Sequence, residues 1–208
     1  MQRTTRPLTA MAAGLMAIAA ITAAATTGMT TSAAEGPAHD GHGSDHGRGT
    51  LDVNDANVKR SLAQVRRATA RFHDIDTAKA AGYELGWVNG ATPPARIITN
   101  CVANPTLGAM GYHYFNNELM ADNAVNLLEP EVLVYATGDD GDLELVAVEW
   151  IARGPNTLPP GPAEPPIVLG TPLHILVPAV GFHIMHAWVW KPNPAGMFAD
   201  FNPDVTCP

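Results

Sequence analysis

Three side chains in the second half of the sequence form a candidate metal-binding set. His113 lies in the segment GAMGYHYFN, Glu149 in LVAVEWIA and His186 in FHIMHAWVW, and these segments are rich in apolar residues. Imidazoles and carboxylates in apolar surroundings require a hydrogen-bond partner, an opposite charge or a metal ion. Two imidazoles and one carboxylate are found as ligands in zinc sites with an open position and in non-haem iron sites.

A fourth histidine, His174, lies near the start of an expected strand. As a reserve ligand it would complete a closed four-ligand site. The bound ion would be a transition metal, namely copper, zinc or iron. Aromatic residues beside the ligands are candidates for hydrogen bonds around the site, and they are Tyr112, Tyr114 and Trp188.

The segment 182–190 contains two histidines, and the strand period decides which of them belongs to the set. Valine, isoleucine and tryptophan favour a strand here, in which alternate side chains point to opposite faces. His186 then shares a face with Trp188 and Trp190, whereas His183 points the other way. In a helix, both histidines would lie on one face. We expect His186 at the site.

A long helical segment precedes the expected strands. From Asp55 to about Ala81 the apolar residues recur at spacings of three and four, which indicates one buried helix face. Asp52 or Asn54 could cap its start, and Gly82 is placed to end it. A break near residues 73–74 would divide it into a long and a short helix. The apolar positions are Val58, Leu62, Val65, Ala68, Phe72 and Ile75.

After Gly82, short apolar runs between glycine, proline and asparagine predict strands and turns. The clearest unit is a hairpin of residues 132–137 and 143–152, in which Glu149 shares a face with Leu145. The proline-rich residues 154–172 cannot form a central strand. Further strands are expected at residues 96–102, 111–115, 174–177 and 182–190. We expect an α+β fold, with an N-terminal helix or helix pair packed on a mostly antiparallel β-sheet or a small open barrel.

The N-terminal 50 residues are expected to lie outside this domain. Residues 1–34 combine two early arginines, an apolar run over 10–25 and a Ser-Ala-Ala end, as a secretory signal peptide does. The run is weaker than the roughly 20 strongly apolar residues of a spanning helix. Residues 35–50 should be disordered, and they either bind metal weakly or act as a solvating leader. The leader histidines are His39, His42 and His46.

Residues 51–208 are expected to form a single globular domain of a secreted protein without membrane association. The two cysteines, Cys101 and Cys207, are an even pair that should form a disulfide in an oxidising compartment. The formal net charge of −8 argues against nucleic acid or an anionic membrane as partner. The expected partner is a metal ion or a small molecule, and the sequence does not indicate the oligomeric state.

Four segments resemble a family of exported bacterial proteins of uncharacterised activity. They are GAMGYHYFN, LLEPEVLVYA, LELVAVEWI and HAWVWKPNPAGMFADFNPDVTC, and the resemblance covers roughly residues 62–207. The resemblance implies that His113, Glu149 and His186 act as one unit and that Cys207 is a structural terminus. It transfers no activity, and His183 is outside the shared pattern.

Three functions remain open after these observations. The first is a secreted protein that binds copper or zinc through the two histidines and the glutamate. The second is a metal-dependent hydrolase or oxygenase that uses the same ligands. The third is a metal-free structural or interaction module, in which the three side chains form a hydrogen-bond network. No nucleophile elbow, P-loop or dinucleotide fingerprint supports metal-free catalysis.

Overall fold

The structure is a computed structural model that describes residues 51–175 and 181–208. The expected signal segment 1–34 and the histidine-rich segment 35–50 lie outside the described residues. So do the last two residues of the strand expected at 174–177.

Three consecutive helices form the N-terminal side of the described chain. They are α1 (Ala56–Thr69), the 3₁₀ helix η1 (Ala70–His73) and α2 (Ile75–Ala80). The cap of α1 is Asp55, whose side chain accepts hydrogen bonds from the backbone of Asn57 and Val58, so the expectation of Asp52 or Asn54 was wrong. Asp52 accepts from the Asn54 N–H instead, which makes a turn before the helix. Gly82, with a φ of 92°, follows the end of α2 as expected.

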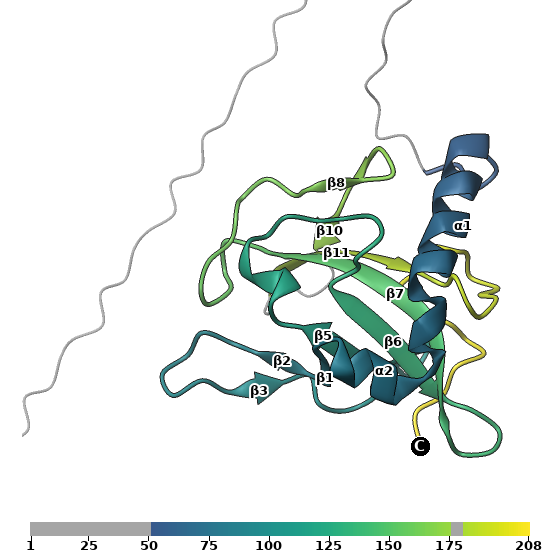
Figure 1. Cartoon of the computed structure of the whole chain (residues 1–208), viewed down its shortest axis with the longest axis horizontal. Coiled ribbons are helices and arrows are strands. Elements are labelled where there is room, and N and C mark those ends of the chain that lie inside the picture. Colours follow the sequence, from purple (N-terminus) through teal and green to yellow (C-terminus); the bar gives the residue numbers. More distant parts are fainter. Residues whose placement is uncertain (1–50, 176–180) are drawn as a thin grey trace, which may run out of the picture. The chain divides into compact units, whose positions relative to one another are not determined.

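An open, seven-stranded sheet forms the rest of the fold, and its neighbouring strands pair antiparallel. The order is β1-β5-β6-β7-β11-β10, and β4 pairs with β5 beside β1. The helix pair lies against this sheet (Figure 1), which confirms the α+β class and excludes a closed barrel. The bounds are β1 Tyr83–Leu85, β4 Val102–Asn104, β5 Gly108–Asn116, β6 Val132–Thr137, β7 Leu143–Arg153, β10 His174–Ile175 and β11 Phe182–Ala187.

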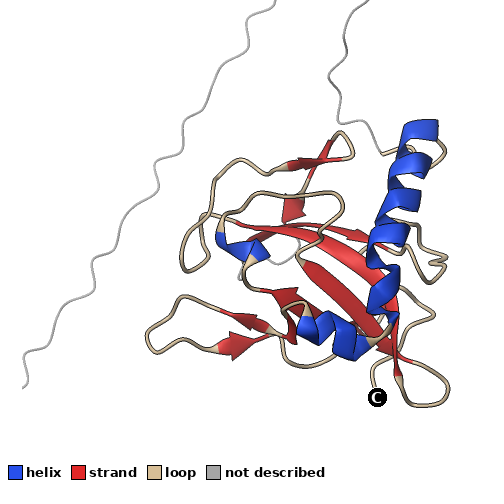
Figure 2. Cartoon of the chain, in the orientation of Figure 1, coloured by secondary structure: helices blue, strands red, loops and turns tan. Residues whose placement is uncertain are grey.

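The remaining elements are short and are joined by long loops (Figure 2). Two small hairpins pair β2 (Trp87–Val88) with β3 (Arg96–Ile97), and β8 (Ile167–Val168) with β9 (Thr171–Pro172). A 3₁₀ turn, η2, covers Leu119–Ala121.

Two expected strands differ from those observed. The single strand expected at residues 96–102 is divided between β3 and β4, because Ile98 has a φ of 58° and turns the backbone out of the extended conformation. β11 ends at Ala187 rather than at Trp190, and the Val189 N–H donates to the Ala187 carbonyl in a tight turn. Trp190 therefore does not share the face of His186.

The sheet buries apolar side chains on both faces. On the face covered by α1, η1 and α2, here called the helix face, Leu62, Val65 and Phe72 pack against the sheet. The opposite face, here called the tail face, is covered by Trp87, Met120 and parts of the C-terminal tail, residues 188–208. The sheet residues of the helix face include Tyr114, Leu133, Tyr135, Trp150 and Met185, and those of the tail face include Phe115, Val132, Val134, Ile151 and Ile184.

A disulfide fixes the C-terminal tail beside the start of β4. Cys101 and Cys207 are joined, with their Cα atoms 5.7 Å apart and 106 positions apart in sequence, which confirms the expected pair. In the chain-entropy model, closing a loop of this length contributes about 4 to 5 kcal/mol. The tail also pairs with β5, since Ala109 and Asn202 exchange backbone hydrogen bonds of 3.1 and 3.0 Å. Among the described residues, none of the helices has the length and apolar character to cross a membrane.

Candidate functional site

The predicted ligands come together on the tail face from three strands, β5, β7 and β11, which lie in the order β5-β6-β7-β11. His186 on β11 lies directly opposite Glu149 on β7. On the other side of β7, Glu149 is opposite Val132 of β6, and His113 of β5 is opposite Val134. β6 therefore separates His113 from Glu149 by about 10 Å of sheet. Both side chains are long enough to meet above the two small valines.

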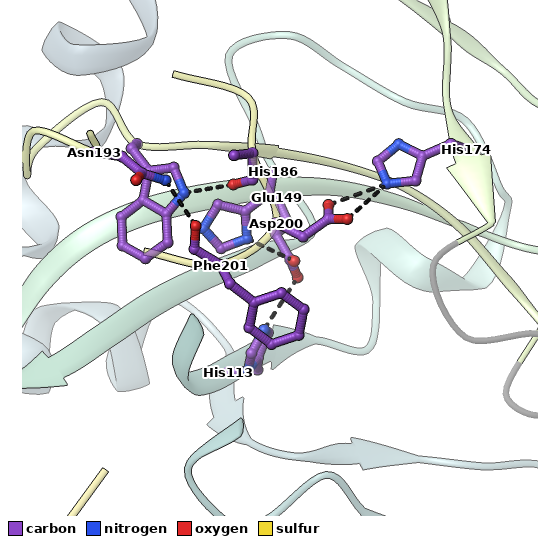
Figure 3. A network of polar contacts seen from close by, with 9 residues as sticks. His113, Glu149, His174, His186, Asn193, Asp200 and Phe201 are labelled. Carbon is purple, nitrogen blue, oxygen red and sulfur yellow. Dashed lines mark hydrogen bonds and ion pairs between the residues drawn. The ribbon is translucent and has the colours of Figure 1, made fainter. Parts of the chain in front are cut away.

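The resulting group of His113, Glu149 and His186 is buried and tightly spaced. Nδ1 of His186 lies 2.9 Å from Oε1 of Glu149, and Nε2 of His113 lies 3.5 Å from Oε2. Figure 3 shows the carboxylate between the two imidazoles. The exposed fractions are 3% for His113, 2% for Glu149 and 0% for His186. One ligand atom from each residue lies within 4.8 Å of the others, and the group is the one potential metal-ligand cluster among the described residues.

Glu149 is ionised in this environment. Burial alone would raise the pKa of its carboxyl group, but the charge interactions and hydrogen bonds of His113 and His186 outweigh burial and hold that pKa well below its usual value. The site therefore contains a buried negative charge that the two imidazoles stabilise.

Each histidine of the group presents only one ring nitrogen to the carboxylate. Nδ1 of His113 and Nε2 of His186 are buried and have no hydrogen-bond partner in the protein. The ring of Trp188 lies against His186, with 4.6 Å between the ring centroids, and its Nε1–H donates to the Ala199 carbonyl at 2.6 Å. Trp188 thus forms a wall of the site and bonds to the tail rather than to the ligands.

The two tyrosines beside His113 lie on the wrong face to assist the site. Tyr114 is buried in the helix-face core and contacts Tyr135 edge-on at 5.0 Å, and Tyr112 packs against the same core. Their positions follow from the strand period, because the neighbours of a residue in a strand point away from it. The expectation that Tyr112 and Tyr114 surround the bound group is corrected accordingly.

His174 stands apart from the group and pairs with a residue of the tail. Its Nε2 lies 3.0 and 3.3 Å from the two carboxylate oxygens of Asp200. The hydrogen bond to Asp200 raises the pKa of His174 against the effect of burial, and the charges of Asp200 and Glu149 raise it further. His174 is therefore not a fourth ligand in this arrangement, because Asp200 holds its imidazole.

His183 points to the other face, as the strand period predicted. It lies opposite Ala152, which belongs to the helix-face core. Its Nε2 lies 3.2 Å from the Pro162 carbonyl, and its Nδ1 has no protein partner. His186 and not His183 thus joins the carboxylate.

A shift in the pairing of β6 and β7 changes the expected neighbours of Glu149. Val134 is opposite Ala147 but Tyr135 is opposite Leu145, so Val146 is an extra residue in β7. Leu145 consequently faces the helices and Val146 faces the tail, the reverse of the expected alternation. The freed Val146 carbonyl accepts from the backbone of Trp190 and Lys191.

A second buried carboxylate, Glu131, escaped the sequence analysis. It precedes β6, is 1% exposed, and its Oε2 accepts a 2.9 Å hydrogen bond from the Ile151 N–H. Burial raises the pKa of Glu131 to about 8. The available signal was an acid directly before an apolar run, at Glu131 ahead of residues 132–134.

No family model, curated protein or solved structure matches the sequence.

Proposed function

We propose that the protein binds one divalent transition metal ion, copper or zinc, through His113, Glu149 and His186. The observation that carries this proposal is a carboxylate, 2% exposed, held between two buried imidazoles. These are ligand types that both ions accept. The disulfide supports our further proposal that the protein works outside the cytoplasm.

The charge of the group favours a bound cation. With both imidazoles neutral, Glu149 would bring an uncompensated negative charge into the interior, which is costly. A proton on one imidazole or a divalent ion can supply the balancing charge. The ion would bind the imidazole nitrogens that face the carboxylate, Nε2 of His113 and Nδ1 of His186.

The spacing supports the same proposal. Ligand atoms of a tetrahedral zinc ion with bonds of about 2.1 Å lie about 3.4 Å apart. The His113–Glu149 separation is 3.5 Å, and the widest separation in the set is below 4.8 Å. Binding therefore requires the His186–Glu149 pair, now 2.9 Å apart, to open by about 0.5 Å, and the widest pair to approach by about 1 Å. Both changes are within the reach of rotamer adjustment.

Burial favours a binding protein over a metal-dependent enzyme. Three protein ligands leave one position open on a tetrahedral ion, as in hydrolytic zinc enzymes. A substrate must reach that position, however, and the three ligands are at most 3% exposed. The metal-free module is the second alternative, in which a proton shared within the group balances Glu149.

The metal content of the protein tests this proposal. The chain is purified without an affinity tag, with His39, His42 and His46 replaced by glutamine to remove weak leader binding. It is dialysed against buffered Cu²⁺ or Zn²⁺ and measured by elemental mass spectrometry. We expect one equivalent of metal per chain. A chain that takes up neither ion would overturn the proposal and leave the group as a metal-free network.

A further inference from the structure

The proposed metal site is closed to solvent, so an ion must enter through a defined part of its cover. The three ligands lie beneath the tail face, where Trp188 and the tail cover the sheet. Residues 199–201 are held over this region by side-chain contacts. Trp188 donates to the Ala199 carbonyl, Asn193 donates to the Phe201 carbonyl, and Asp200 accepts from His174.

The His174–Asp200 contact lies on the tail face, near its exposed edge. His174 is opposite Ile184 in the β10–β11 pair, and His186 follows Ile184 by two residues. Such diagonal neighbours on one face have Cβ atoms about 7–8 Å apart. Figure 3 shows His174 and Asp200 beside the buried group.

The His174–Asp200 pair is accessible, unlike the buried group. The side chains are 48% exposed for His174 and 23% for Asp200. Asp200 also borders a cavity of about 410 Å³ and is the one charged residue among the described residues that line it. The wall is otherwise formed by Thr106, Leu107, Ala195, Ala199, Phe201 and Pro203. A carboxylate in such a wall attracts cations.

We propose that His174 and Asp200 form an entry site through which the metal ion reaches His113, Glu149 and His186. This inference rests on the proposed function. Asp200 and His174 each replace a water molecule on the hydrated ion, and rotation of His174 toward its diagonal neighbour His186 then passes the ion inward. The pair offers a carboxylate oxygen and an imidazole nitrogen, the same ligand types as the buried group. The ion changes ligands without any change of oxidation state.

An entry site affects the rates of binding without affecting the affinity. The test compares the parent chain, in which the leader histidines are replaced, with its His174→Gln and Asp200→Asn variants. Cu²⁺ uptake is followed by stopped-flow quenching of tryptophan fluorescence, because Trp188 lies against His186. Release is followed on mixing with a chelator. We expect uptake to slow by about tenfold, at the low end of the on-rate gain that charged clefts give, and release to slow by the same factor because the affinity is unchanged. The dissociation constant should stay unchanged.

His73→Gln is the matched control. His73 is also an exposed histidine beside a tryptophan, with its ring 4.4 Å from that of Trp190, but it lies in η1 on the helix side of the sheet. Its replacement should leave both rates as in the parent chain.

The other outcomes overturn either the entry site or the proposed function. Unchanged rates in both test variants, with binding intact, would overturn the entry site alone. A weaker dissociation constant in His174→Gln would make His174 a permanent ligand and would also overturn it. Failure of the parent chain to bind Cu²⁺ or Zn²⁺ would overturn the proposed function itself.

Discussion

β11 buries two histidines on opposite faces of one sheet, and only one of them belongs to a candidate site. His183 and His186 are 2% and 0% exposed, and each has one ring nitrogen without a partner in the protein. His186 faces the ionised Glu149, whereas His183 faces the Pro162 carbonyl. Burial and an unpaired nitrogen are therefore shared by both histidines, and the carboxylate alone distinguishes the site.

The physical difference lies in the charge that each partner brings. The N–H of a neutral imidazole can donate a hydrogen bond to a carbonyl oxygen, and this pair needs no balancing charge. A carboxylate brings a negative charge that burial penalises unless a cation or a proton balances it. The helix-face histidine thus completes a hydrogen bond, while the tail-face histidine contributes to the proposed metal site.

The largest expected effect comes from Glu149→Gln, which removes the charge but keeps the shape. Loss of residues that only support a ligand lowers metal affinity by about 10- to 100-fold, so loss of this ligand should lower it by at least about 100-fold. Calorimetric titration with Zn²⁺ measures the change. The control is Glu131→Gln, because Glu131 is the other glutamate at 1–2% exposure and lies outside the group. Equal affinities for Glu149→Gln and the parent chain would remove Glu149 from the site.

The next effect separates the two histidines by their response to metal. Zn²⁺ at about 100 times its dissociation constant should raise the free energy of unfolding of the parent chain by about 2.7 kcal/mol. This gain should vanish in His186→Gln and persist in His183→Gln. Urea unfolding with and without Zn²⁺ measures it. If both variants kept the gain, or both lost it, the distinction between the two histidines would be wrong.

A smaller effect is the pH dependence of the free energy of unfolding, which should differ between the two buried glutamates. Burial raises the pKa of Glu131 from 4.5 to about 8, so between these values the folded state keeps a proton that the unfolded state releases. Stability from this group is therefore full below about pH 4.5 and is lost as the pH rises toward 8. One proton changes the free energy of unfolding by at most about 1.4 kcal/mol per pH unit. Because the protein can relax around the charged carboxylate, we expect a total loss of about 2 kcal/mol.

Glu131→Gln should abolish that loss while keeping an acceptor for the Ile151 N–H. The measurement is the free energy of unfolding of both chains between pH 5 and pH 8, taken as a difference so that the histidines cancel. Glu149 contributes little in this range, because its lowered pKa places its effect at more acid pH. If the free energy of unfolding changed equally with pH in the two chains, the raised pKa of Glu131 would be wrong.

The smallest effect concerns the wall of the site. Trp188→Phe keeps an aromatic ring against His186 but removes the hydrogen bond to the Ala199 carbonyl. We expect a loss of about 1 kcal/mol in the free energy of unfolding and unchanged metal stoichiometry. Thermal unfolding and elemental analysis check the two parts, and loss of the metal would show that Trp188 positions the ligands.

The alternation of strand residues predicted much of the fold and of the site. It separated His186 from His183, and the same rule applied to His113 would have placed Tyr112 and Tyr114 on the far face. The β6–β7 hairpin followed from two apolar runs around a glycine-rich turn. These features depend on neighbours in sequence, which a single chain reveals.

Contacts between distant segments were beyond the same reasoning. The extra residue Val146 depends on how β6 and β7 align, and apolar residues on both faces give no sign of the shift. Asp200 lies in a tail without period, so its bond to His174 could not be anticipated. Glu131 is buried because β7 extends past the end of β6 and leaves the Ile151 N–H to be satisfied by a side chain.

The place of β11 in the sheet also couples burial of the Glu149 charge to its pairing. In the strand order, β11 is the neighbour that keeps β7 from being an edge strand on the side away from β6. The register that pairs β11 with β7 also places His186 directly opposite Glu149. One strand thus both covers the carboxylate and brings it a second imidazole.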